Sequence, residues 1–173
     1  MSSKVESGLD QKVMDKTIKK FSGSPGSLLG ILEELQNLHP NKYLPKTVLH
    51  YVSEKLEVPL ARIYSVVTFY SLFNLKPEGK HLITICRGTT CHTEGSRGLL
   101  DHVLKLLNLN IDLNDNGKKI FLTTEDMKFT VQTVACFGQC AHSPAVEIDG
   151  IMYSNVKKDQ IEQIIQKIIV EDK

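Results

Sequence analysis

The chain has 173 residues, of which 41% are apolar and 24% charged. These are ordinary globular proportions and exclude a disordered or fibrous chain. Its 21 Lys and Arg against 20 Asp and Glu lack the cationic excess of a nucleic-acid-binding protein, so we expect no nucleic-acid partner. No apolar run approaches the roughly 20 residues of a bilayer span, and the start of the chain has no signal-peptide or transit-peptide pattern. We expect a cytoplasmic protein of one large or two small domains, without direct membrane insertion and with reduced cysteines.

The first part of the chain, over residues 1–77, has the apolar spacing of helices. Four helices are expected, over 9–21, over 28–38, after Pro45, and from Pro59 through the β-branched stretch 66–70. The last of these helices is expected to carry four large apolar side chains, of which at least half are buried in the core and the others are available for docking. They are Phe69, Tyr70, Leu72 and Phe73. These patterns predict an N-terminal helical bundle.

After a hinge at Lys76–Lys80 the apolar period changes, and strands appear. The expected elements are a strand over 81–85, a helix over 95–107, strands over 129–134, 145–148 and 151–153, and a helix over 157–170. Turns are expected at Asn114–Gly117 and Asp149–Gly150. The order β-α-β-β-β-α makes residues 78–173 a second domain and gives the whole chain an α+β fold class.

All four cysteines lie in this second domain, in two pairs that follow the ends of predicted strands. Cys86 and Cys91 are separated by four residues, and Cys136 and Cys140 by three. Loops at the same end of a sheet can bring both pairs together into a four-thiolate site. A [2Fe–2S] cluster takes two thiolates on each iron, so the pairing suggests Cys86 and Cys91 on one iron and Cys136 and Cys140 on the other.

Other interpretations of the cysteines stay open. Structural zinc sites also use four cysteines, but commonly begin with C-x2-C. A [4Fe–4S] site usually has a compact C-x2-C-x2-C run, and a thioredoxin redox motif is C-x2-C; neither occurs here. Four buried, inert thiols are the remaining alternative. His92 and His142 stand beside the cysteines, but four thiolates already complete the ligand count, so we expect these histidines near the cluster and not bound to it.

Residues around the cysteines have types that suit a cluster site. Gly88 and Gly138 allow unusual backbone angles and close approach of amides to sulfur. Thr89 and Thr90 offer hydroxyl donors, and Pro144 is expected to stiffen the second loop. Hydrogen-bond donors aimed at sulfur stabilise the more negative, reduced state of such a centre.

Motifs for other chemistry are missing. The sequence contains no G-x-G-x-x-G, no G-x-x-x-x-G-K-[ST] and no G-x-S-x-G. A [2Fe–2S] cluster moves one electron at a time and performs no bond chemistry by itself. Any flavin, nicotinamide or hydrogen site that it serves is therefore expected on another subunit.

Five motifs between residues 27 and 170 match one known family: Tyr43–Pro45, Val67–Phe73, Pro77–Lys80, Cys86–His92 and Cys136–Pro144. On these motifs the chain resembles the thioredoxin-like [2Fe–2S] subunit of the NADH-oxidising module of respiratory complex I. It is equally similar to the corresponding subunit of NAD(P)-linked and electron-bifurcating hydrogenases and of formate dehydrogenases. One departure is Ser154 after Tyr153, where many members have glycine.

The resemblance implies a helical bundle followed by a thioredoxin-like ferredoxin domain, with Cys86, Cys91, Cys136 and Cys140 as ligands of one [2Fe–2S] cluster. It also implies a flavoprotein partner that binds FMN and NAD(P), an iron–sulfur-rich catalytic subunit, and no activity of the chain alone. A free thioredoxin-like ferredoxin is the alternative function. The additional helical domain of residues 1–77 favours a subunit, because a free carrier has no need of it.

Overall fold

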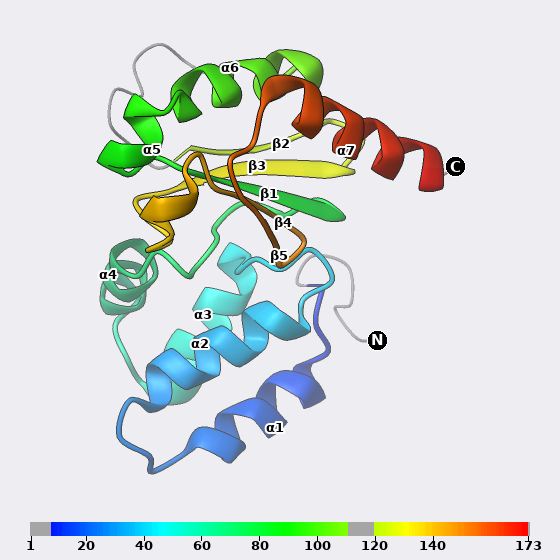
Figure 1. Ribbon diagram of the computed structural model, residues 1–173. Coiled ribbons are helices and arrows are strands. Elements are labelled where there is room, and N and C mark those ends of the chain that lie inside the picture. The colour runs from blue at the N-terminus through cyan, green and yellow to red at the C-terminus, as the bar shows by residue number, and fades with distance from the viewer. Residues whose placement is uncertain (1–7, 111–119, 173) are drawn as a thin grey trace. The chain divides into compact units, whose positions relative to one another are not determined.

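A computed structural model describes residues 8–110 and 120–172. The contacts within the chain divide it between Glu78 and Gly79 into two compact units. The first consists of helices and the second of a mixed sheet with helices (Figure 1), which confirms the α+β class. The predicted turn at Asn114–Gly117 lies outside the described residues. In the described ranges no helix is both long and apolar enough to cross a bilayer.

The first unit contains the four predicted helices, α1 (Gln11–Phe21), α2 (Ser27–Leu38), α3 (Lys46–Leu56) and α4 (Leu60–Phe69). Pro45 and Pro59 stand immediately before α3 and α4, where a fixed φ suits the helix start and a missing N–H costs no hydrogen bond. The spacing of apolar residues along the helices places one side of each in a shared core: Ile31, Leu32, Leu35, Val48, Leu49, Val52, Ile63 and Val67.

The segment after α4 corrects one expectation. Because α4 ends at Phe69, Phe69 and Phe73 are not successive positions on one helix face. Phe73 is buried, whereas Phe69, Tyr70 and Leu72 are exposed by 79%, 39% and 47%. The expectation that at least half of these four side chains fill the core was therefore wrong. We call Phe69–Leu75 the apolar segment; Leu75 at its end is exposed as well.

The second unit is built on a five-stranded sheet with the order β2-β3-β1-β4-β5. Its strands are β1 (His81–Cys86), β2 (Phe121–Thr123), β3 (Phe129–Val134), β4 (Val146–Ile148) and β5 (Ile151–Tyr153). β1 and β3 pair in parallel, with Cys86 opposite Val134, and the other neighbours are antiparallel. The predicted turn at Asp149–Gly150 joins β4 to β5, and both of its residues have positive φ.

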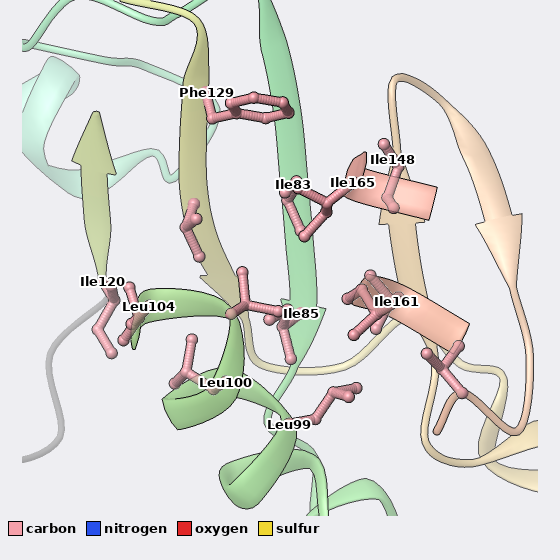
Figure 2. Packing of buried hydrophobic residues seen from close by; sticks show 14 residues of the cluster. Ile83, Ile85, Leu99, Leu100, Leu104, Ile120, Phe129, Ile148, Ile161 and Ile165 are labelled. Atoms are coloured by element: carbon pink, nitrogen blue, oxygen red, sulfur yellow. The ribbon is translucent and has the colours of Figure 1, made fainter. Parts of the chain in front are cut away.

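Helices α6 (Ser96–Leu106) and α7 (Lys158–Glu171) cover one face of this sheet (Figure 1). Figure 2 shows Ile83 and Ile85 of β1 between Leu99 and Leu100 of α6 and the isoleucines of α7. Alternate residues of a strand share one face, so the two β1 isoleucines point into the same core. This core consists of residues of the second unit alone.

Three elements of this unit were not predicted. β2 has three half-buried residues and therefore no alternating pattern to reveal it. The short helix α5 (Thr89–Thr93) and the 3₁₀ turn η1 (Cys140–His142) lie inside the two cysteine loops. Both are shorter than the window of about 11–18 residues over which a helical pattern can be recognised.

A half-buried histidine links the end of α7 to the sheet. His81 Nδ1 lies 2.7 Å from Asp149 Oδ2, and its Nε2 lies 2.9 Å from Asp172 Oδ2. Burial works against the charged imidazolium, but the two carboxylates outweigh it and raise the pKa of His81 above its usual 6.5. Hydrogen bonds from Lys80 and His81 lower the pKa of Asp172. The pairing offsets the unfavourable position of a carboxylate at a helix C-terminus.

We expect Asp172→Asn to loosen α7 more at pH 6 than at pH 9. A raised histidine pKa contributes stability below the unfolded value, and this contribution is lost as the pH rises through the folded pKa. Above that pKa His81 is neutral and its charge no longer attracts Asp172, whereas the ion pair of Asp172 with Lys80 remains. Hydrogen exchange of the α7 amides at both pH values measures the difference. Glu171→Gln, which removes an exposed charge beside it, is the control, and an equal effect of Asp172→Asn at both pH values would contradict the argument.

Candidate metal centre

Parallel pairing brings the two cysteine loops to one end of the sheet, as the sequence predicts. Cys86 is the last residue of β1 and pairs with Val134, the last residue of β3. Arg87 N donates to Val134 O at 2.8 Å, just beyond the ladder. Cys136 follows two residues later, so both loops start from the same pair of strand ends.

The first cysteine pair is buried. Cys86 and Cys91 are each 2% exposed, and their sulfurs are hydrogen-bonded to each other. The turn of α5 makes this approach possible, since His92 N donates to Gly88 O at 2.8 Å and directs Cys91 back toward β1.

The two buried thiols have opposite pKa shifts. Burial raises the pKa of Cys86. Hydrogen bonds from the amides of Gly88 and Phe137 lower this pKa in part, and the hydrogen bond with Cys91 raises it further. Burial also opposes ionisation of Cys91, but hydrogen bonding with the Ser143 hydroxyl, the Ala145 amide and Cys86 outweighs it and lowers the pKa of this thiol. Cys91 is therefore the member of the pair that more readily becomes a thiolate, the form that binds metal.

The second cysteine pair is exposed. Gly138 N donates to Cys136 Sγ at 3.2 Å, and Gly138 has a φ of 80°, which favours glycine. The neighbouring amide of Phe137 donates to Cys86 Sγ. The amides of the second loop thus reach a sulfur of each pair.

Ser143 forms a further link between the two cysteine loops. Its Oγ lies 3.3 Å from Cys91 Sγ and donates to Cys140 O at 2.8 Å. The amide of Ala145 donates to Cys91 Sγ, and Cys86 N donates to Ala145 O at 3.2 Å. Sequence reasoning missed Ser143; the only signal is a hydroxyl residue three positions after Cys140.

The other expected neighbours have smaller roles. The side chains of His92 and His142 are exposed, as are those of Thr89 and Thr90. The backbone carbonyl of Thr90 accepts a hydrogen bond from Thr93 Oγ1 at 2.8 Å within α5. Within residues 8–110 and 120–172, no three His, Cys, Asp or Glu side chains gather closely enough to hold one metal ion.

Gly88 provides a test of whether a cluster fits. A Cβ at Gly88 would lie 3.5 Å from both Cys86 Sγ and Cys136 Sγ and 3.2 Å from Ala135 O. A side chain at position 88 would thus contact one sulfur of each cysteine pair. The backbone angles of Gly88 are ordinary, so the need is for space and not for unusual φ. Four thiols in two pairs, with amide donors directed at sulfur, fit a [2Fe–2S] cluster.

Comparison with known proteins identifies the family. The model of the thioredoxin-like [2Fe–2S] ferredoxins matches residues 14–169. The chain belongs to this family. The match confirms the predicted thioredoxin-like ferredoxin fold and the predicted [2Fe–2S] cofactor. The role of each cysteine as a ligand stays a prediction.

Relatives of this family member are components of larger enzymes. In Rickettsia felis, the matching component of NADH-quinone oxidoreductase is 35% identical over 152 residues, covering 87% of this chain and 85% of that protein. The HndA component of the NADP-reducing hydrogenase of Solidesulfovibrio fructosivorans is 34% identical, covering 86% of this chain and 80% of that protein.

Among solved structures, an NAD⁺-reducing [NiFe]-hydrogenase in the air-oxidised state matches with a TM-score of 0.64 and 22% identity. The match covers 86% of this chain but only 23% of the hydrogenase chain. At this level of sequence identity, the match shows that the chain and part of the hydrogenase share a fold.

We expect Gly88→Ala to reduce cluster content severalfold. The added methyl group would occupy the space between Cys86 and Cys136, and its contact with Ala135 O is too close to relax without moving the backbone. Iron and sulfide content of the anaerobically purified chain measures the effect. Gly98→Ala is the matched control, because its Cβ meets only ordinary van der Waals contacts on α6. Full cluster content in Gly88→Ala would show that the site accommodates a side chain at position 88.

Proposed function

We propose that this ferredoxin is a one-electron-transfer subunit of a multisubunit NADH dehydrogenase or hydrogenase, with Cys86, Cys91, Cys136 and Cys140 as cluster ligands. The observation that carries the proposal is the convergence of both cysteine loops at the ends of β1 and β3. The relatives support the same function, since they are subunits of an NADH-quinone oxidoreductase and of an NADP-reducing hydrogenase.

The chain's own residues supply the environment of the centre. Bound there, a [2Fe–2S] cluster supplies one-electron transfer. The amides of Gly88, Phe137, Gly138 and Ala145 direct N–H groups at the cysteine sulfurs, which stabilises negative charge on them. The first pair is buried and the second exposed, so we propose that electrons enter and leave on the side of Cys136 and Cys140.

We propose that the partners are a flavoprotein subunit that binds FMN and NAD(P), and an iron–sulfur-rich catalytic subunit. The chain itself then has no NADH-oxidising activity and is a redox subunit of the complex. We further propose a cytoplasmic location, with contact to a membrane only through partners.

We propose that the helical unit of residues 1–77 docks on the partner through the apolar segment Phe69–Leu75. Gln36 holds this segment in place, because its side-chain amide donates to Leu72 O at 2.9 Å and accepts from Asn74 N at 2.7 Å. The exposed side chains are thus presented on a fixed backbone. Exposed aromatic and aliphatic side chains on a fixed backbone are typical of protein interfaces.

The test is purification of the tagged chain from its own cells, with FMN and NADH-dependent dye reduction measured in the same fraction. Phe69→Ala is expected to reduce the recovered FMN severalfold while cluster content stays unchanged, because Phe69 is 79% exposed and contributes little to the fold. Val170→Ala, which truncates another exposed apolar residue in the second unit, is the control. A chain that purifies without flavin would instead support the free ferredoxin.

A further inference from the structure

The Ser143 hydroxyl contacts one residue of each cysteine pair, and the two contacts compete for its single proton. Its Oγ is 3.3 Å from Cys91 Sγ and 2.8 Å from the carbonyl oxygen of Cys140. A serine hydroxyl has one proton and can donate only one of these bonds, while its lone pairs can accept another. Ser143 is half-buried, so water competes only in part for these contacts.

The number of protons decides which bond forms. As a thiol, Cys91 can donate its S–H to Ser143 Oγ, which leaves the serine proton for the Cys140 carbonyl. A sulfur bound to iron has no proton and can only accept. The serine proton is then the only one that can join these two atoms, and a hydrogen bond to the charged sulfur is stronger than one to a neutral carbonyl.

We propose that Ser143 is a positioning residue that donates its proton to the ligated sulfur of Cys91 and thereby raises the reduction potential of the centre. Reduction adds negative charge to the cluster and its sulfurs, so a donor aimed at sulfur stabilises the reduced state more than the oxidised one. The inference rests on the proposed role of Cys91 as a ligand.

Ser143 differs from the other donors at this site. The hydrogen bonds of Gly88, Phe137, Gly138 and Ala145 to sulfur come from backbone amides, which nearly every residue type provides. The hydroxyl of Ser143 depends on the identity of the residue. This position therefore sets the potential through a side chain that a single substitution removes.

The experiment compares the full chain with Ser143→Ala, Ser143→Thr and Ser143→Val, each loaded anaerobically with iron and sulfide. Thr and Val have nearly the same volume and differ mainly in the hydroxyl. Iron and sulfide content and the visible spectrum come first, and a spectroelectrochemical titration of the cluster follows. Thr93→Ala is the control, since it removes a nearby hydroxyl that bonds to Thr90 O and not to a thiol.

At the midpoint potential of the unchanged chain, Ser143→Ala and Ser143→Val are expected to lower the ratio of reduced to oxidised cluster by about tenfold. For one electron this corresponds to a shift of ~59 mV to more negative potential. Ser143→Thr and Thr93→Ala are expected to remain within about twofold of the unchanged chain, since a twofold ratio is ~18 mV on the same scale.

Equal potentials in the Ala, Val and Thr variants would overturn the proposal. So would loss of the cluster in both hydroxyl-free variants with retention in Ser143→Thr, because the hydroxyl would then be holding the Cys140 carbonyl in place. Failure of the unchanged chain to bind a [2Fe–2S] cluster would instead contradict the proposed function. The order of the measurements separates the two failures.

Discussion

Replacing Cys86 with serine is expected to destabilise or abolish the cluster, so that the chain loses part or all of the roughly two irons and two acid-labile sulfides of a [2Fe–2S] protein. Cys86 is 2% exposed and its sulfur accepts hydrogen bonds from the amides of Gly88 and Phe137. A free serine hydroxyl is not ionised at neutral pH, and its oxygen is a poorer ligand than a thiolate for the iron of such a cluster. We expect the same loss for the serine variants of Cys91, Cys136 and Cys140.

Iron and sulfide analysis and the visible spectrum of anaerobically purified protein measure this loss. Thr93→Ser is the control, because it changes an exposed residue of α5 two positions from Cys91. Retention of the full spectrum by any one serine variant would remove that cysteine from the ligand set. Stoichiometric zinc without iron in the unchanged chain would favour the zinc alternative over the whole assignment.

Deletion of residues 1–77 is expected to leave a red ferredoxin domain that no longer joins its complex. The core of the second unit is formed by residues from Ile83 to Ile165, and the core of the first unit by residues from Leu9 to Phe73. Each unit therefore has its own buried apolar cluster, and the second has no need of the first to build its core. The exposed apolar segment Phe69–Leu75 is removed with the helices.

The spectrum of the truncated domain reports its cluster, and co-purification of FMN reports assembly. The spectrum is expected to match that of the full chain, while recovered FMN is expected to fall to background. Assembly of the truncated domain at full affinity would show that the helices have no docking role. A truncated domain without a cluster would show that the cysteine loops depend on the helical unit.

Periodicity in the sequence was sufficient to predict the main helices and most of the sheet. Leu32 and Leu35 of α2 and Ile161 and Ile165 of α7 recur at helical spacing and are buried as that spacing predicts, whereas Leu38 at the end of α2 is exposed. The strand predicted to end at Cys86 is β1 at the centre of the sheet, although its last four residues are all buried and do not alternate in exposure. The helices are long elements in which one face meets a core, and such elements leave the clearest pattern.

The parts that were missed are set by short-range geometry and by tertiary contacts. β2 is three residues long and is defined by its pairing with β3, which no local pattern reveals. The exposure of Phe69 and the burial of Phe73 follow from where α4 ends, and helix ends are the least predictable part of a helix. At the centre, the sequence predicted that both cysteine loops lie at one end of the sheet, whereas the contact of Ser143 with Cys91 has no sequence pattern.

The parallel register of β1 and β3 has a consequence for how this family member tolerates length changes. Cys86 is held opposite Val134, and one inserted residue in either strand would displace the following cysteine by about 3.3 Å and turn its side chain to the opposite face. Evolution of such a chain is thus expected to admit substitutions within β1 and β3 but not insertions or deletions. The turn between β2 and β3, at residues 124–128, is free of this constraint, since its length leaves the distance from β3 to Cys136 unchanged.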